Sequence, residues 1–128
     1  MNFVYVAESD EQAEREYIIH LQHFFEDFAR SSPQWLAPPG YLSTEQLKIR
    51  AAGADKMHGG FDFKAVSSAF FIAVGTAEKV ANQIGEWTAR MSTNHINSVI
   101  HVADMPHWKA VKNMTLFAEE VIPRLRRG

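Results

Sequence analysis

The sequence contains no cysteine, and this absence excludes disulfide bonds, thiolate metal sites and cysteine nucleophiles. It also suits a reducing compartment, so we expect a cytoplasmic protein. No apolar run approaches the roughly 18 residues that a membrane-spanning helix needs. The first residues carry no basic segment of the kind that opens a signal peptide. We therefore expect neither a membrane span nor a secretory leader.

There is also little net charge, because 13 basic residues face 15 acidic ones and leave −2 at neutral pH. Such a balance excludes a general electrostatic attraction to nucleic acid. The arginines near the end of the chain (Arg124, Arg126, Arg127) complement a helix dipole without needing an anionic partner. The length of 128 residues fits one domain of roughly 100–200 residues, so we predict a single domain over residues 1–128.

Local patterns predict a strand followed by a helix at the start of the chain. The β-branched and aromatic run of residues 3–7 is typical of a buried strand. Ser9 or Asp10 can cap the helix that follows. Apolar residues then recur with spacings of 4, 4, 3 and 4, which predicts one apolar helical face through about residue 30; they are Ala13, Tyr17, Leu21, Phe24 and Phe28.

Residues 31–63 interrupt this pattern. Proline and glycine punctuate the stretch, and a short helix is expected from the Ser43–Gln46 cap to about Ala52. Several of its residues are too apolar for a solvated linker, and Trp35 could anchor an interface. We therefore predict an ordered, irregular excursion that packs on another surface.

The second half of the chain predicts two further strand–helix units. A buried strand is expected over 70–74, with a helix from the Gly75–Thr76 turn to Met91. A third strand is expected over 96–103, and a turn at 104–106 leads into a helix over 107–125 in which Pro123 disturbs the last turn. Repeated units of this kind indicate an α/β fold with a parallel sheet.

Three parallel strands are too few to close a sheet. A (β/α)8 barrel needs roughly 250 residues, so a chain of 128 residues is incomplete as a barrel. A short parallel sheet leaves strand edges without partners, and such edges pair readily with another chain. We therefore expect a homo-oligomer or a partner chain that completes the barrel.

Four stretches of the sequence resemble the bacterial luciferase-like flavin-dependent monooxygenases, which are (β/α)8 TIM barrels. Residues 4–13 are similar to a strand and acidic helix start of that family, and residues 36–43 resemble the loop that follows. Residues 74–80 (Val-Gly-Thr-Ala-Glu-Lys-Val) match its strand-to-helix turn, with Ala77 where the family has proline. The closing helix, at 104–107 and 114–126, carries the most specific match.

The resemblance implies an oxidoreductase that uses FMN, or a deazaflavin, with a small organic substrate. It covers nearly the whole chain but only the C-terminal third of the family, so most of the family's flavin contacts have no counterpart here. The chain is then expected to be inactive alone. The alternative is a non-catalytic oligomeric remnant or interaction module without flavin binding. A third hypothesis is a small-ligand binding module that uses the Gly75–Thr76 turn.

The candidate site residues lie after the predicted strands. Gly75 and Thr76 open a helix, where free N–H groups attract phosphate, so they are the candidate cofactor-binding residues. His107 is the candidate catalytic residue, because the turn before it resembles the family's catalytic face and histidine transfers protons near neutral pH. His101 is a weaker candidate, and Asp104 is expected to cap the last helix.

One helical stripe could bind a divalent ion, since two imidazoles and two carboxylates share it; its residues are Glu16, His20, His23 and Asp27. The stripe adjoins the apolar face of its helix, where polar side chains usually form a solvated border. We therefore interpret it as that border and predict no metal.

Overall fold

The computed structural model describes residues 2–28, 40, 42–49, 62–69 and 72–126. It has three parallel strands, β1 (Asn2–Val6), β2 (Ile72–Gly75) and β3 (Ser98–Val99). The helices are α1 (Asp10–His23), α4 (Phe63–Ala69), α5 (Ala77–Met91), α6 (His107–Leu116) and α7 (Ile122–Leu125). Two π-helical turns, η1 (Phe24–Phe28) and η2 (Phe117–Val121), extend α1 and α6. The predicted α/β class with a small parallel sheet is confirmed.

The order of the strands across the sheet is β2-β1-β3. Strand β1 therefore lies in the centre and pairs with both of the strands that follow it in the chain. In a (β/α)8 barrel, by contrast, consecutive strands are neighbours around the ring. The observed order matches the first three strands of the doubly wound sheet of order 2-1-3-4-5.

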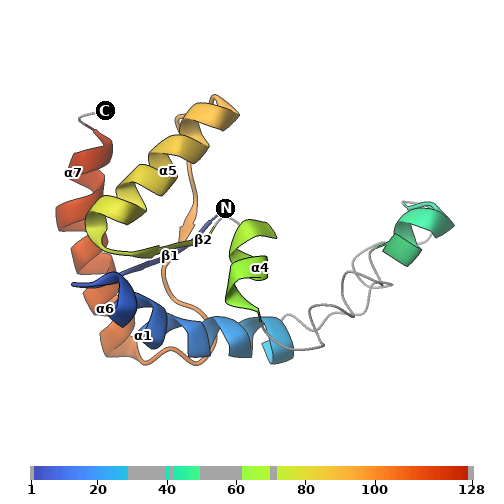
Figure 1. Ribbon diagram of the computed structural model, residues 1–128, viewed down its shortest axis with the longest axis horizontal. Helices are drawn as coiled ribbons and strands as arrows, with labels where there is room; N and C mark the ends of the chain where they lie inside the picture. Colours follow the sequence, from blue (N-terminus) through green and yellow to red (C-terminus); the bar gives the residue numbers. More distant parts are fainter. Residues whose placement is uncertain (1, 29–39, 41, 50–61, 70–71, 127–128) are drawn as a thin grey trace.

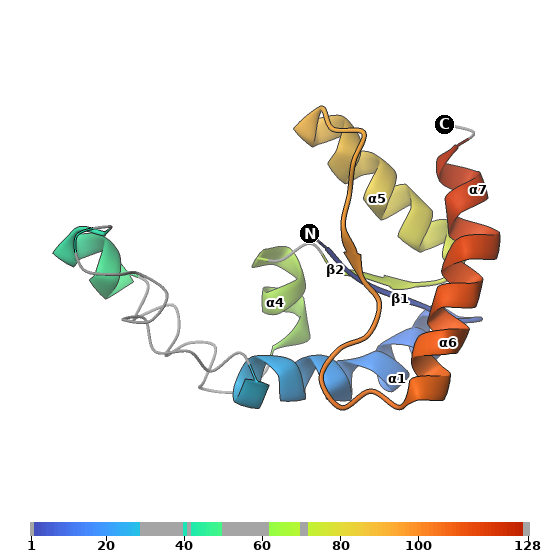
Figure 2. The same ribbon diagram turned by 180° about the vertical axis from the view of Figure 1, so that it is seen from behind.

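Helices cover both faces of the sheet, and alternating side chains of β1 serve the two sides. Phe3 and Tyr5 pack in one core cluster with Tyr17 and Leu21 of α1. Val4 and Val6 pack in a second cluster with side chains of α5 and of η2, among them Val80, Ile84 and Val121. Figures 1 and 2 show α1 and α5 on opposite sides of the strands, and the α6–α7 helix at the end of the sheet where β1 stops.

The first helix begins as the sequence predicts. The Ser9 hydroxyl accepts a hydrogen bond from the Gln12 N–H at 3.1 Å, which caps α1. After His23 the helix widens into η1. Phe24 and Phe25 lie there against Phe3 of β1, with ring centroids 5.4 and 6.0 Å from it. The aromatic end of this helix is therefore fixed on the sheet.

The third strand is much shorter than the predicted 96–103, because a side chain takes its place beside β1. Buried Asn113 of α6 accepts from the Val6 N–H at 2.9 Å and donates to the Val4 carbonyl at 2.8 Å. The same amide also donates to the Ile100 carbonyl at 3.1 Å. Asn113 thus satisfies the backbone groups that a longer β3 would have paired.

The closing helix is continuous but changes its hydrogen bonding before Pro123. The Ile122 N–H donates to the Phe117 carbonyl five residues back, so η2 is a widened turn. Proline has no N–H to continue the ladder and its ring crowds the preceding turn. The predicted disturbance by Pro123 takes the form of a π turn, η2, between α6 and the short α7.

Helix α4 was not predicted. Its local signal is Asp62, whose Oδ1 accepts from the backbone N–H groups of Lys64 and Ala65 at 2.9 and 3.3 Å. Residues 44–49 are helical, as part of the predicted short helix. Most of the remaining excursion, including Trp35, lies outside the described residues. Within the described part of the chain, no helix is both long enough and apolar enough to cross a membrane.

Candidate functional site

The carboxyl ends of the three strands meet at one edge of the sheet, because the strands are parallel. Ligands of open α/β sheets bind at this edge. Here Glu8, Ser9 and Asp10 follow β1, Thr76 follows β2, and the turn of residues 100–106 follows β3. We call this set of loops the carboxyl edge.

At the junction of β1 and β2, a carboxylate of the chain itself lies at the start of α5. Oδ1 of Asp10 accepts from the Thr76 N–H at 2.8 Å, and Nζ of Lys79 lies 3.3 Å from Oδ2. The Thr76 N–H, the Lys79 ammonium and burial act on this group, and the hydrogen bond and the ammonium together lower the pKa of Asp10. The N–H that we expected to receive an external anion is therefore bound to Asp10.

Gly75 is required at this junction for two reasons. Its φ is +146°, a backbone conformation that residues with a side chain rarely adopt. A Cβ added at this position would overlap Oδ1 of Asp10 and lie 2.7 Å from Cδ of Lys79. Thr76 caps α5, since its hydroxyl accepts from the Lys79 N–H at 3.4 Å.

Between α1 and the start of α6, the structure brings His20 together with Asp104 and Lys109, which lie 84 and 89 residues later in the sequence. Nδ1 of His20, on α1, lies 2.8 Å from Oδ1 of Asp104. Nε2 of the same ring lies 3.2 Å from Nζ of Lys109, on α6. His20 is buried, whereas the Asp104 side chain is exposed. The hydrogen bond from His20 lowers the pKa of Asp104.

Asp104 does not cap the last helix, contrary to our prediction. Pro106 holds the N-cap position of α6, and no side chain caps that helix. The carboxylate of Asp104 is bonded to His20 instead. His107, the candidate catalytic residue, is the first residue of α6 and is exposed. His101 is also exposed, and its Nε2 lies 2.9 Å from the Met105 carbonyl.

A carboxylate and a tyrosine form a further polar group under α1. The Tyr5 hydroxyl donates to Glu16 Oε2 at 2.7 Å, and the Gln12 amide donates to Oε1 at 2.9 Å. Burial, followed by the Glu16 hydrogen bond, raises the pKa of Tyr5. For Glu16, burial opposes ionisation, but the bonds from Gln12 and Tyr5 and the charges of Lys112 and Lys109 outweigh it and lower its pKa.

The side chains of the helical stripe that was considered for a metal ion bind different partners in the structure. His20 faces Asp104 and Lys109, and the Lys109 ammonium disfavours a second cation beside the ring. Glu16 is held by Tyr5 and Gln12. Among the residues that the structure describes, no three His, Asp or Glu side chains are arranged to hold a metal ion.

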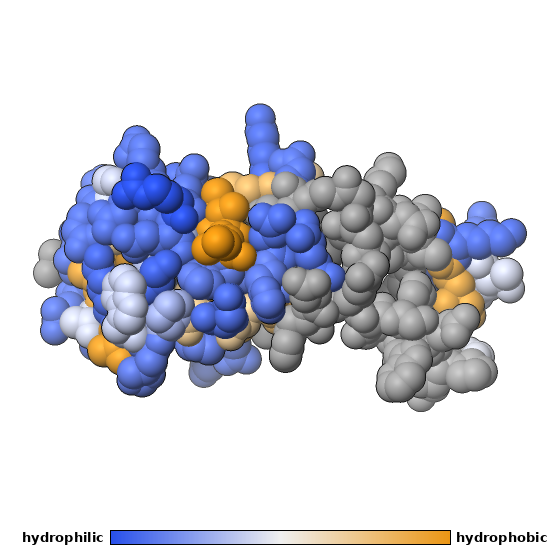
Figure 3. Space-filling view, turned by 90° about the horizontal axis from the view of Figure 1, so that it is seen from below, coloured by the Kyte–Doolittle hydropathy of each residue, from blue (hydrophilic) through white to orange (hydrophobic). Residues whose placement is uncertain are grey.

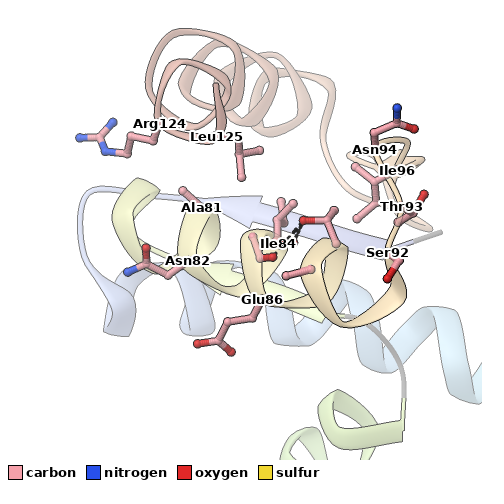
Figure 4. A pocket seen from close by; sticks show the side chains of 13 residues that line it. Ala81, Asn82, Ile84, Glu86, Ser92, Thr93, Asn94, Ile96, Arg124 and Leu125 are labelled. Carbon is pink, nitrogen blue, oxygen red and sulfur yellow. Dashed lines mark hydrogen bonds between the residues drawn. The ribbon is translucent and has the colours of Figure 1, made fainter. Parts of the chain in front are cut away.

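A separate open groove of about 1240 Å³ lies between α5, the turn at residues 92–96 and α7. Figure 4 shows Ala81 and Ile84 on α5 facing Leu125, with Asn94 and Ile96 beside the opening. Its lining comes from the middle and C-terminal part of α5 and from the residues that precede β3. Since α5 starts at the carboxyl edge and runs back along the sheet, the groove is distinct from the Gly75–Thr76 junction.

Comparison of the chain with protein-family models, with curated proteins and with solved structures gives no match.

Proposed function

We propose that this chain takes part in flavin-dependent monooxygenation as the C-terminal part of a luciferase-like (β/α)8 enzyme. FMN or a deazaflavin would be the cofactor and a small organic molecule the substrate. The observation that carries the proposal is the carboxyl edge, where Asp10, Thr76, Asp104, His107 and Lys109 follow the strand ends or begin the helices after them. The four motifs that resemble the family include residues of all three of these loops.

The junction of β1 and β2 has the chemistry to hold an anion such as a flavin phosphate. Asp10 already supplies an anionic group to the Thr76 N–H and to the Lys79 ammonium. A phosphate at this position would replace the Asp10 carboxylate on the same two donors. When bound, the flavin would supply the redox chemistry, and this chain's part would be to bind and orient it.

The proposal also requires a change in strand pairing. A barrel places each strand beside its neighbours in the sequence, whereas β3 pairs with β1 here. Only Asn2 and Phe3 of β1 are in register with β3, while four residues are in register with β2. When a partner chain or second copy completes the barrel, β3 would give up its short pairing with β1 and pair with another strand.

Titration of FMN, oxidised and reduced, and of a reduced deazaflavin tests this function. We expect saturable binding, and H107A should weaken it roughly tenfold, the loss of about 1.4 kcal/mol. H95A is the matched control, because His95 is also exposed but precedes β3 at the other end. D10A should tighten binding by removing the competing carboxylate, whereas E11A should not. A folded chain that binds none of the three ligands would contradict the proposal.

A second candidate, a non-catalytic interaction module, is favoured by the exposed apolar residues of α6. Trp108, Val111 and Met114 are 59%, 41% and 46% exposed within seven residues of one helix. Large apolar side chains gathered at the surface mark contact sites. This candidate predicts no flavin binding and a melting temperature that rises with protein concentration, since association stabilises the folded state. A constant melting temperature would contradict it.

A further inference from the structure

His20 is a buried imidazole in contact with charged groups from two other parts of the chain. It is 6% exposed. Asp104, in the turn before α6, lies 2.8 Å from Nδ1, and Lys109, in the first turns of α6, lies 3.2 Å from Nε2. Lys109 also donates to the Glu16 carbonyl of α1 at 3.1 Å. These contacts join α1 to the turn at residues 100–106 and to the start of α6.

The partners determine where the ring carries its proton. A lysine ammonium can only donate a hydrogen bond, so Nε2 of His20 must accept and carries no hydrogen. The single ring proton then lies on Nδ1 and is donated to the Asp104 carboxylate. The geometry therefore requires a neutral imidazole in the Nδ1–H form.

Protonation of this ring has opposite consequences for its two partners. An imidazolium donates from both nitrogens, so the bond to Asp104 is kept and gains charge. At Nε2, an N–H would face the Lys109 ammonium. The hydrogen bond from Lys109 would then be lost, and the two positive charges would repel each other. Two charged or titratable side chains of α1 act on the partners of the ring: His23 acts on Asp104, and Glu16 interacts with Lys109 while its carboxylate is bound to Tyr5 and Gln12.

The turn that these contacts hold contains a constrained residue. Ala103 has φ +47°, in the left-handed region that a residue with a Cβ occupies at a cost of about 1–2 kcal/mol. It directly precedes Asp104, whose bond to His20 fixes the turn against α1. Protonation of His20 strengthens the bond that holds this strained turn, so the movement falls on α6, where Lys109 loses its contact with the ring.

We propose that Asp104, His20 and Lys109 form a pH-sensitive switch at the carboxyl edge. With neutral His20, Lys109 bridges α6 to the ring and to the Glu16 carbonyl. With protonated His20, Asp104 stays bonded while Lys109 leaves the ring, and the first turns of α6 separate from α1. This device does not depend on the proposed flavin chemistry, because it uses side chains of the chain alone.

The unsubstituted chain gives the first test. Two-bond ¹H–¹⁵N correlation spectra of the histidine rings distinguish the two neutral forms of imidazole. At about pH 8, above the usual range of imidazole titration, His20 should show the Nδ1–H form. A spectrum of the Nε2–H form for His20 would overturn the proposal, since that form cannot accept a bond from Lys109.

Trp108 can report the movement of Lys109, because Nζ lies 5.8 Å from the centre of its ring. We would record ¹⁹F spectra of protein labelled with 5-fluorotryptophan, with H107Q as the background to remove the neighbouring imidazole. Between about pH 8 and pH 5.5, the range of imidazole titration, the Trp108 resonance should shift. The shift should be lost in H20Q and K109M and kept in K112M, a lysine variant on the same helix. A shift that persists in H20Q would overturn the switch.

Discussion

Strand β1 is paired with a strand along one side and largely with a side chain along the other. Four of its residues are in register with β2 and two with β3. Beyond those two, the amide of Asn113 bonds to Val4 and Val6. The side chain of one helix residue therefore makes the hydrogen bonds that a longer β3 would make with β1. On the β2 side, backbone groups make the hydrogen bonds of β1, so many side chains are compatible with the pairing. On the β3 side, the hydrogen bonds of the Val4 carbonyl and the Val6 N–H depend on the side chain of Asn113.

The largest expected effect comes from removing that side chain. N113L keeps the number and branching of the side-chain heavy atoms but leaves the Val6 N–H and the Val4 and Ile100 carbonyls without their partner. Each buried polar group left unsatisfied costs about 1–3 kcal/mol, so the free energy of unfolding should fall by roughly 3 kcal/mol or more. Urea denaturation measures it, with N82L on the exposed face of α5 as the control. A loss no larger than that of N82L would contradict the role of Asn113.

An intermediate effect is expected on the β2 side, at the carboxyl end of the strand. G75A places a Cβ against Asp10 and forces a side chain into a positive φ, which should cost about 2 kcal/mol. G85A is the matched control, because a Cβ there meets nothing within 4 Å and alanine favours a helix by up to about 1 kcal/mol. Melting temperatures should therefore move in opposite directions, and equal losses would contradict this account of Gly75.

The smallest effect concerns the charge at the same junction and depends on pH. The pKa of Asp10 is lowered in the folded chain, so this carboxylate stabilises the fold above its unfolded pKa, and the contribution is lost as the pH falls through the folded value. D10N should lower the free energy of unfolding, measured by urea denaturation, by less than about 1 kcal/mol at pH 7 and have no effect near pH 2. E11Q is the control. A loss of stability in D10N that is equal at both pH values would contradict the predicted pH dependence.

Local features of the sequence predicted the β2 side well. Thr76, Ser9 and the apolar face of α5 act within a few residues of their own position, so capping and periodicity are enough to predict them. Strand β2 was expected at 70–74 and is described at Ile72–Gly75, a small shift of its end. Gly75 and Thr76 were correctly placed at the turn into α5, although their binding role stays a prediction.

The β3 side could not be predicted in the same way, because its contacts join distant parts of the chain. Apolar residues at 96, 99, 100 and 102 indicated a long strand, but Asn113, more than ten residues later, takes its place. His20 and Asp104 are 84 residues apart in the sequence, and no local pattern pairs them. The available signal was a lone asparagine on the inner face of a helix, which the sequence alone cannot match to a strand edge.

Native-state hydrogen exchange tests the difference between the two sides of β1 most directly. The Val6 N–H, bonded to Asn113, and the Ala7 N–H, bonded to Gly75 on the β2 side, are neighbours at the carboxyl end of β1. We predict that the Ala7 N–H exchanges only on global unfolding, whereas the Val6 N–H exchanges through a local opening of α6 and is less protected. In N113L, the protection of the Val6 N–H should be lost. Equal protection of the two amides, both limited by global unfolding, would contradict the account.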